Sequence, residues 1–133
     1  MTKKIILGIE YDGARWHSLE LGSTLFRQLS KTQKCEALGF SLIHIFDNEW
    51  KDEKINQKLK NHLKNIINGN VFDGIGKNDI IELNRALFPK TLCPKGYSLI
   101  DESEPTIVER KSITGEVFHV PDCGTLTYRR IAG

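Results

Sequence analysis

Residues 5–50 constrain the fold most, because two short apolar runs flank a stretch with helical periodicity. The first run, IILGIEYDG, begins at Ile5, and the second, FSLIHIF, begins at Phe40. Such runs, rich in β-branched residues, predict buried strands. Two strands joined by a helix form a βαβ unit, in which the strands are parallel and the crossover is right-handed. The predicted fold class is therefore α/β.

The connecting helix is predicted over residues 23–38. Ser23 or Thr24 can cap its start, and Gly39 stands where glycine commonly follows a helix. One stripe of this helix carries the residues expected to face the strands, namely Leu25, Leu29, Thr32 and Cys35 or Glu36. The second strand then covers residues 40–46.

A second, longer helix is predicted from Asp47 or Asn48 to about Ile67. Its apolar stripe consists of Ile55, Leu59, Leu63 and Ile66. Lysines fill its other face, at positions 51, 54, 58, 60 and 64. The helix ends at residues 68–70, a glycine-containing loop follows over residues 71–77, and a short helix is predicted from Asn78 to Pro89.

From Tyr97 onward the pattern changes to short strands. The segments SLI, TIVE, EVFHV and TLTYRR alternate with turns at Glu104-Pro105, Thr114-Gly115 and Asp122-Cys123-Gly124. The predicted organisation is a core over residues 1–70, a linker with a short helix over residues 71–95, and a β-rich tail over residues 96–133. This tail is expected to pack on the core or on a partner.

Composition limits the functional classes. The net charge of +2 permits nucleic acid binding without requiring it. No apolar run reaches the roughly 20 residues that span a membrane, and the chain begins with no signal peptide. Cys35, Cys93 and Cys123 form no CxxC pair, which favours free thiols in a reducing cytoplasm, and their spacing indicates no zinc site.

The polar residues after the first strand are the candidate site. Side chains alternate along a strand, so Glu10 and Asp12 project from the same face, and His17 follows in the next loop. These acids are either a functional site or solvated carboxylates at a strand end. His44, inside the second strand, is interpreted as a core histidine with its hydrogen bonds satisfied. Trp16 and Trp50 are interpreted as core anchors.

Three blocks in order, GIEYDGARWHS, KTQKCEALGF and SLIHIFDNEW, resemble the very-short-patch-repair (Vsr)-like nucleases. The resemblance is closest to phage homing endonucleases of this type, within the wider PD-(D/E)XK class, and covers residues 5–67. It implies a restriction-endonuclease-type core, here a βαβ unit plus a helix, with a small β-rich C-terminal appendage. It also implies metal-dependent hydrolysis of DNA in the cytoplasm of a bacterial host.

In the family that this sequence resembles, the strand with Glu10 and the loop with His17 line the metal site. Asp12 lies beside them, so Glu10, Asp12 and His17 are the candidate catalytic residues. The resemblance implies that Glu10 and Asp12 bind Mg²⁺ or Mn²⁺, which prefer oxygen ligands. Two departures stand out. The family's upstream Asp has no counterpart among the residues before Glu10, and a family His or Asp is replaced by Gln28.

The lysines of the second predicted helix have two interpretations. They form either a solvated helix face or a surface for the DNA backbone, with Lys51, Lys54 and Lys58 as the candidates. Three functions remain open from the sequence: an endonuclease or nickase, a nuclease-fold protein that binds DNA without cutting it, and a phage interaction protein with a regulatory or counter-defence role. A homodimer or a protein partner is compatible with each.

Overall fold

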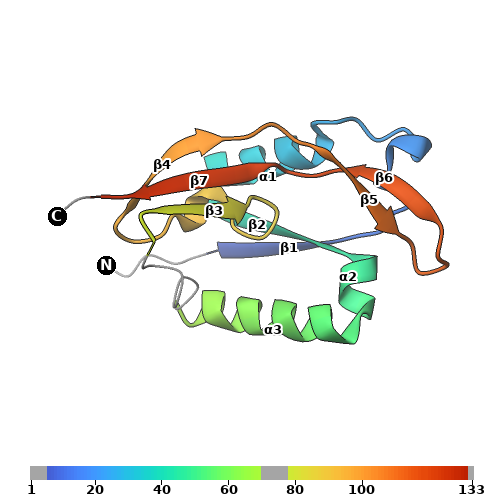
Figure 1. The fold of residues 1–133 in the computed structure, drawn as a ribbon, viewed down its shortest axis with the longest axis horizontal. Helices are drawn as coiled ribbons and strands as arrows, with labels where there is room; N and C mark the ends of the chain where they lie inside the picture. Colours follow the sequence, from blue (N-terminus) through green and yellow to red (C-terminus); the bar gives the residue numbers. More distant parts are fainter. Residues whose placement is uncertain (1–5, 70–77, 132–133) are drawn as a thin grey trace.

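The computed structural model describes residues 6–69 and 78–131 (Figure 1). The predicted loop over residues 71–77 lies outside them. The described segments contain three α-helices, two short 3-10 helices and seven strands. In chain order these are β1 (Ile6–Asp12), η1 (Leu19–Leu21), α1 (Arg27–Ala37), β2 (Phe40–Phe46), α2 (Asp47–Lys51), α3 (Glu53–Ile67), β3 (Ile80–Asn84), η2 (Lys90–Leu92), β4 (Tyr97–Glu102), β5 (Ile107–Lys111), β6 (Val117–Pro121) and β7 (Thr125–Arg130).

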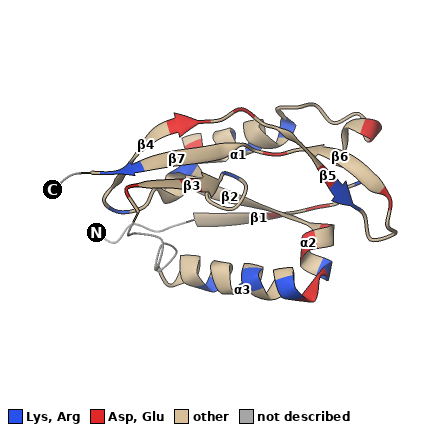
Figure 2. Ribbon diagram, in the orientation of Figure 1, with Lys and Arg blue, Asp and Glu red and all other residues tan. Residues whose placement is uncertain are grey.

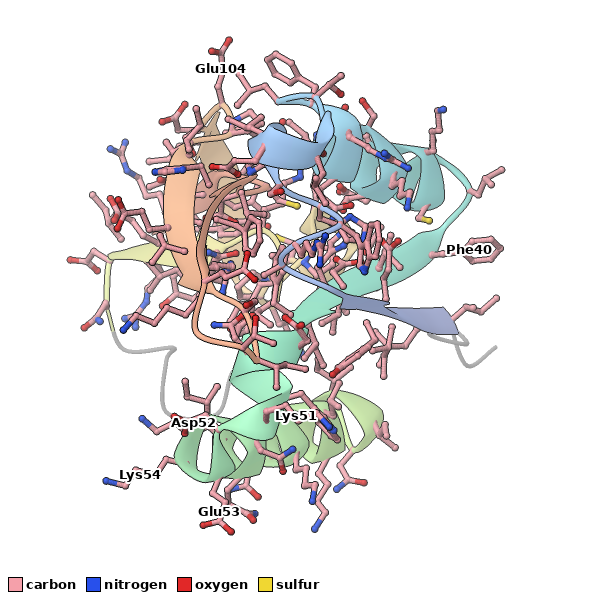
Figure 3. All side chains as sticks on the ribbon, turned by 90° about the vertical axis from the view of Figure 1, so that its right-hand side faces the viewer. Phe40, Lys51, Asp52, Glu53, Lys54 and Glu104 are labelled. Carbon is pink, nitrogen blue, oxygen red and sulfur yellow. The ribbon has the colours of Figure 1, made fainter. Side chains whose placement is uncertain are left out.

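The strands β1 and β2 pair in parallel, which confirms the prediction for residues 5–50. Odd-numbered residues of β2 face α3, where Ile43 and Ile45 form a buried cluster with Leu59 and Ile66. Even-numbered residues face α1. The two helices therefore cover opposite faces of the strand pair, with α1 above and α3 below it in Figures 1 and 3.

The helix α1 is shorter than predicted, because it begins at Arg27 and not at Ser23. Gly22 has a φ of +89°, a left-handed conformation that ends η1 and turns the chain before α1 starts. Ser23 donates its backbone N–H to the carbonyl of Ser18 at 3.1 Å and does not cap α1. The C-terminal end agrees with the prediction, since Gly39 follows the helix with a φ of +83°.

The single helix predicted after β2 is two helices, α2 and α3, that meet at Asp52. Asp52 has an extended backbone, with a ψ of 120°, and its side chain accepts the backbone N–H groups of Lys54 and Ile55 at 3.0 and 3.1 Å. An aspartate that caps a new helix in this way competes with continuation of the old one.

The short helix predicted from residue 78 to 89 is wrong: residues 80–84 form the strand β3. In this strand Ile81 and Leu83 are buried, whereas Ile80 and Glu82 are exposed. This period of two matches a strand with one buried face, and β3 pairs antiparallel with β7. The nearest helical residues are those of η2, which begins directly after Pro89 and so lies beyond the predicted helix.

The four strands predicted from residue 97 onward are present as β4, β5, β6 and β7. They fall into two groups: β4 and β7 join β3 in a sheet of order β3-β7-β4, and β5 and β6 form a hairpin. The sheet has its own apolar cluster around Leu126 and Tyr128. It is joined to the β1–β2 pair by a backbone hydrogen bond of 2.9 Å from the N–H of His44 to the carbonyl of Ala86. The hairpin places Phe118 and Val120 in a buried cluster with Ala14 and Phe46.

The two tryptophans differ from each other. Trp16 is 70% exposed, so its interpretation as a core anchor is wrong, and the guanidinium of Arg15 lies 5.3 Å from its ring centroid. Trp50 is partly buried against the apolar cluster below β2, as expected. None of the helices in the described segments is long and apolar enough to cross a membrane.

Candidate metal centre

Two neighbouring strands bring three ligand-type side chains together. Glu10 and Asp12 lie on the face of β1 that is turned toward α1, and β2 places His44 directly opposite Glu10 in the parallel register. One ligand atom from each of the three lies within 4.8 Å of the others, a spacing that fits a single metal ion. Strand alternation and strand register together produce this cluster.

Asp12 is the centre of the cluster and is 0% exposed. Its Oδ2 accepts hydrogen bonds from Nε2 of Gln28 at 2.8 Å and from Nδ1 of His44 at 3.0 Å. Its Oδ1 lies 3.3 Å from Nε2 of His17, whose Nδ1 is 3.2 Å from the Gln28 amide nitrogen. A loop, a helix and a strand therefore all contribute contacts to one buried carboxylate.

Glu10 lies nearer the surface, with a side chain that is 24% exposed. Its Oε1 pairs with Nζ of Lys31, on α1, at 2.6 Å, and its Oε2 lies 3.1 Å from Nδ1 of His44. The cluster thus combines two carboxylates with nitrogen groups from the strand β2 and the helix α1.

His44 is held at both ring nitrogens, because Nε2 lies 2.8 Å from the hydroxyl of Thr32. Burial lowers the pKa of His44, but hydrogen bonds with Asp12 and with Cys123 outweigh it and raise the pKa to about 9. In the structure as it stands, the imidazolium therefore compensates Asp12, and Lys31 compensates Glu10.

The hydrogen bonding of two carboxylate oxygens shows whether the cluster suits a cation. Oε2 of Glu10 and Oδ1 of Asp12 are buried, and neither has a hydrogen bond of acceptable geometry. The nearest imidazole nitrogens, Nδ1 of His44 and Nε2 of His17, lie 3.1 Å and 3.3 Å from these oxygens, respectively. Buried carboxylate oxygens without hydrogen bonds are unusual in proteins, and they are the ligands that Mg²⁺ and Mn²⁺ prefer. The residues present fit such an ion.

The structure brings together Glu10, Asp12 and His17, the three residues predicted from the sequence. His17 joins the cluster through its contact with Asp12. His44 is buried and hydrogen-bonded, as interpreted, but it also contacts both acids and so belongs to the cluster. The parallel register places His44 opposite Glu10. The predicted parallel pairing of the two apolar runs was therefore the sequence signal that could have identified it. Thr32 lies on the stripe that was predicted to face the strands, and it contacts His44. Lys31 gave no such signal, because its contact with Glu10 depends on how α1 rotates over the strands.

The predicted DNA-binding lysines are not part of this cluster. Lys51 ends α2, whereas Lys54 and Lys58 lie on α3, and all three are exposed. Figure 2 shows basic positions spread along α3, and Figure 3 labels Lys51 and Lys54 on the far side of the strands from α1. The strand pair therefore separates Lys54 and Lys58 from the acids.

Comparison of the chain with protein-family models, curated proteins and solved structures found no match.

Proposed function

We propose that the protein is a metal-dependent DNA endonuclease or nickase of the Vsr-like homing endonuclease type. The observation that carries the proposal is the convergence of Glu10, Asp12 and His44 from adjacent parallel strands, with two buried carboxylate oxygens that lack hydrogen bonds. The three sequence blocks that resemble these nucleases contain each of these residues.

In this proposal each side chain has a separate task. Glu10 and Asp12 hold a divalent cation, which would stabilise charge on the phosphate and lower the pKa of a bound water. Gln28 fixes the orientation of Asp12 through its hydrogen bond of 2.8 Å. His17 is 17% exposed at its side chain and is the imidazole of the cluster that can reach solvent.

The test is nicking of supercoiled plasmid with Mg²⁺, with Mn²⁺ or with a chelator. The wild type is expected to nick only with the metal. Glu10→Gln is expected to lower the rate about 100-fold or more, because loss of even an outer-shell partner of a metal ligand costs about 10–100-fold. Glu82→Gln is the matched control, because Glu82 is an exposed carboxylate on β3. A Glu10→Gln variant that nicks like the wild type would overturn the proposal.

A second function, DNA binding without cleavage, is favoured by Gln28. Its amide occupies the space between Asp12 and His17 and cannot take a proton from water. A missing general base costs about two to four orders of magnitude in rate. If the protein cleaves DNA and only the missing general base at Gln28 limits the rate, Gln28→His is expected to raise nicking. A plasmid that stays intact with both Gln28→His and the wild type, together with DNA binding, supports the second function.

A further inference from the structure

We propose that Lys31 and Lys34 bind a backbone phosphate of the DNA strand that enters the candidate metal centre, through the hollow between β1 and α1. This inference rests on the proposed function and assigns the route by which its substrate reaches Glu10. It replaces the lysines of α3 as the residues that serve the site.

The hollow leads directly to the cluster. It has a volume of about 400 Å³ and is lined by Ile9, Glu10, Lys31, Lys34, Cys35 and Leu42. Asp12, His44 and Gln28 are at most 2% exposed, whereas Glu10 lines the hollow with a partly exposed carboxylate. A substrate can therefore meet the cluster at Glu10.

The two lysines are placed as a pair. They stand three residues apart on α1, a spacing that puts side chains on the same face of a helix. Lys34 is exposed and has no ion pair with any residue that the structure describes. Two ammonium groups against one carboxylate leave this hollow with an excess of positive charge, which suits a phosphate.

Lys31 also connects the phosphate to the metal ligand. Its ammonium group is 2.6 Å from Oε1 of Glu10, and its side chain is 41% exposed. If the carboxylate of Glu10 binds a cation, it leaves the ammonium group of Lys31. A phosphate oxygen can then take the place of the carboxylate beside Lys31. Leu42, which lies on the same face of β2 as His44, supplies an apolar wall, so a sugar of the same strand has a surface to cover.

The lysines of α3 cannot act at the same place. They lie beyond the β1–β2 pair, whose other face packs on α3 through Ile43 and Ile45. Figure 3 shows α1 and α3 on opposite sides of these strands. A phosphate bound at Lys54 or Lys58 is therefore separated from Glu10 by the apolar core.

The experiment measures binding of a labelled duplex of about 20 base pairs by fluorescence anisotropy over a salt series, with Ca²⁺ present. The variants are Lys34→Gln and the pair Lys31→Gln/Lys34→Gln, and the matched control is Lys54→Gln/Lys58→Gln on α3. Each lost phosphate contact is expected to lower the slope of log K against log salt by about 1. Lys34→Gln leaves the Lys31–Glu10 pair intact and so isolates the phosphate contact.

The inference is supported if the α1 variants lower the salt slope and the affinity while the α3 pair retains both. It is overturned if the α3 pair lowers the slope and Lys34→Gln does not. It is also overturned if the wild type binds no DNA. The proposed function is judged separately by metal-dependent nicking that requires Glu10, so a nicking enzyme with unchanged Lys34→Gln binding contradicts this inference alone. Circular dichroism confirms that each variant folds.

Discussion

Replacing Arg85 with methionine tests how the C-terminal strands are fixed to the βαβ unit. Arg85 is 3% exposed, and its Nη2 lies 2.7 Å from Oε1 of Glu36 on α1. Its Nη1 lies 3.2 Å from Oε2 of Glu102 on β4. The guanidinium therefore connects the helix of the first unit with a strand of the second.

The expected cost follows from the burial of the partners. Glu36 has a side chain that is only 8% exposed, so without Arg85 it becomes a buried carboxylate with no charged partner. Removing one member of a buried ion pair destabilises a protein by about 3–5 kcal/mol. Glu102 is 32% exposed, and without its carboxylate Arg85 still pairs with Glu36, so Glu102→Gln is expected to cost about 1 kcal/mol or less.

Urea unfolding of four variants measures these free energies: Arg85→Met, Glu36→Gln, the double variant and Glu102→Gln. The double variant is expected to be more stable than Arg85→Met, because the unpaired buried charge is gone, with a coupling of about 2 kcal/mol. The reasoning is refuted if Arg85→Met costs less than about 1 kcal/mol, or if the two substitutions simply add.

Two further predictions concern the C-terminal half. Gly124→Ala is expected to destabilise the protein by clearly more than Gly115→Ala in urea unfolding. Both glycines have φ near +90°, but of the two only Gly124 places an added Cβ against a backbone oxygen, that of Ser103. Equal losses would contradict this. The second is that NMR titration finds the pKa of His119 above 6.5, raised by its hydrogen bond to Glu20, and that Glu20→Gln returns it toward 6.5. Hydrogen bonds from His119 lower the pKa of Glu20 to about 2, so the contribution of the pair to stability is complete between about pH 4.5 and 6.5. It is lost as pH rises through the raised pKa of His119, or falls toward that of Glu20; an unshifted His119 would contradict this.

The parallel pair β1–β2 was predictable because local patterns determine it. The apolar runs around Ile5 and Phe40 indicated a parallel pair, and alternation placed Glu10 and Asp12 on one face. The strand β3 was missed because Asn78 and Pro89 resemble the boundaries of a helix. The alternation of Ile81 and Leu83 is too short to indicate a strand until its pairing with β7 is known.

The rest of the candidate centre depends on tertiary packing. Lys31 reaches Glu10 only because α1 lies over β1 at a particular rotation, and no local pattern gives that rotation. The same holds for the exclusion of Lys54 and Lys58, since sequence periodicity shows that α3 has a basic face but not which side of the strands it covers. A helix boundary such as Asp52 was ambiguous for another reason, because a capping residue inside a helical pattern can be read either way.

The measurement that tests the central claim most directly is anomalous scattering from crystals soaked with Mn²⁺. We predict one manganese peak at coordination distance from Glu10 and Asp12, with His44 adjacent, and with Lys31 no longer paired with Glu10. The same soak of Asp12→Asn crystals is expected to leave the position without a peak. A wild-type crystal in which Lys31 and His44 keep their contacts with the acids, and in which manganese binds elsewhere or nowhere, would contradict the metal centre and the nuclease function that depends on it.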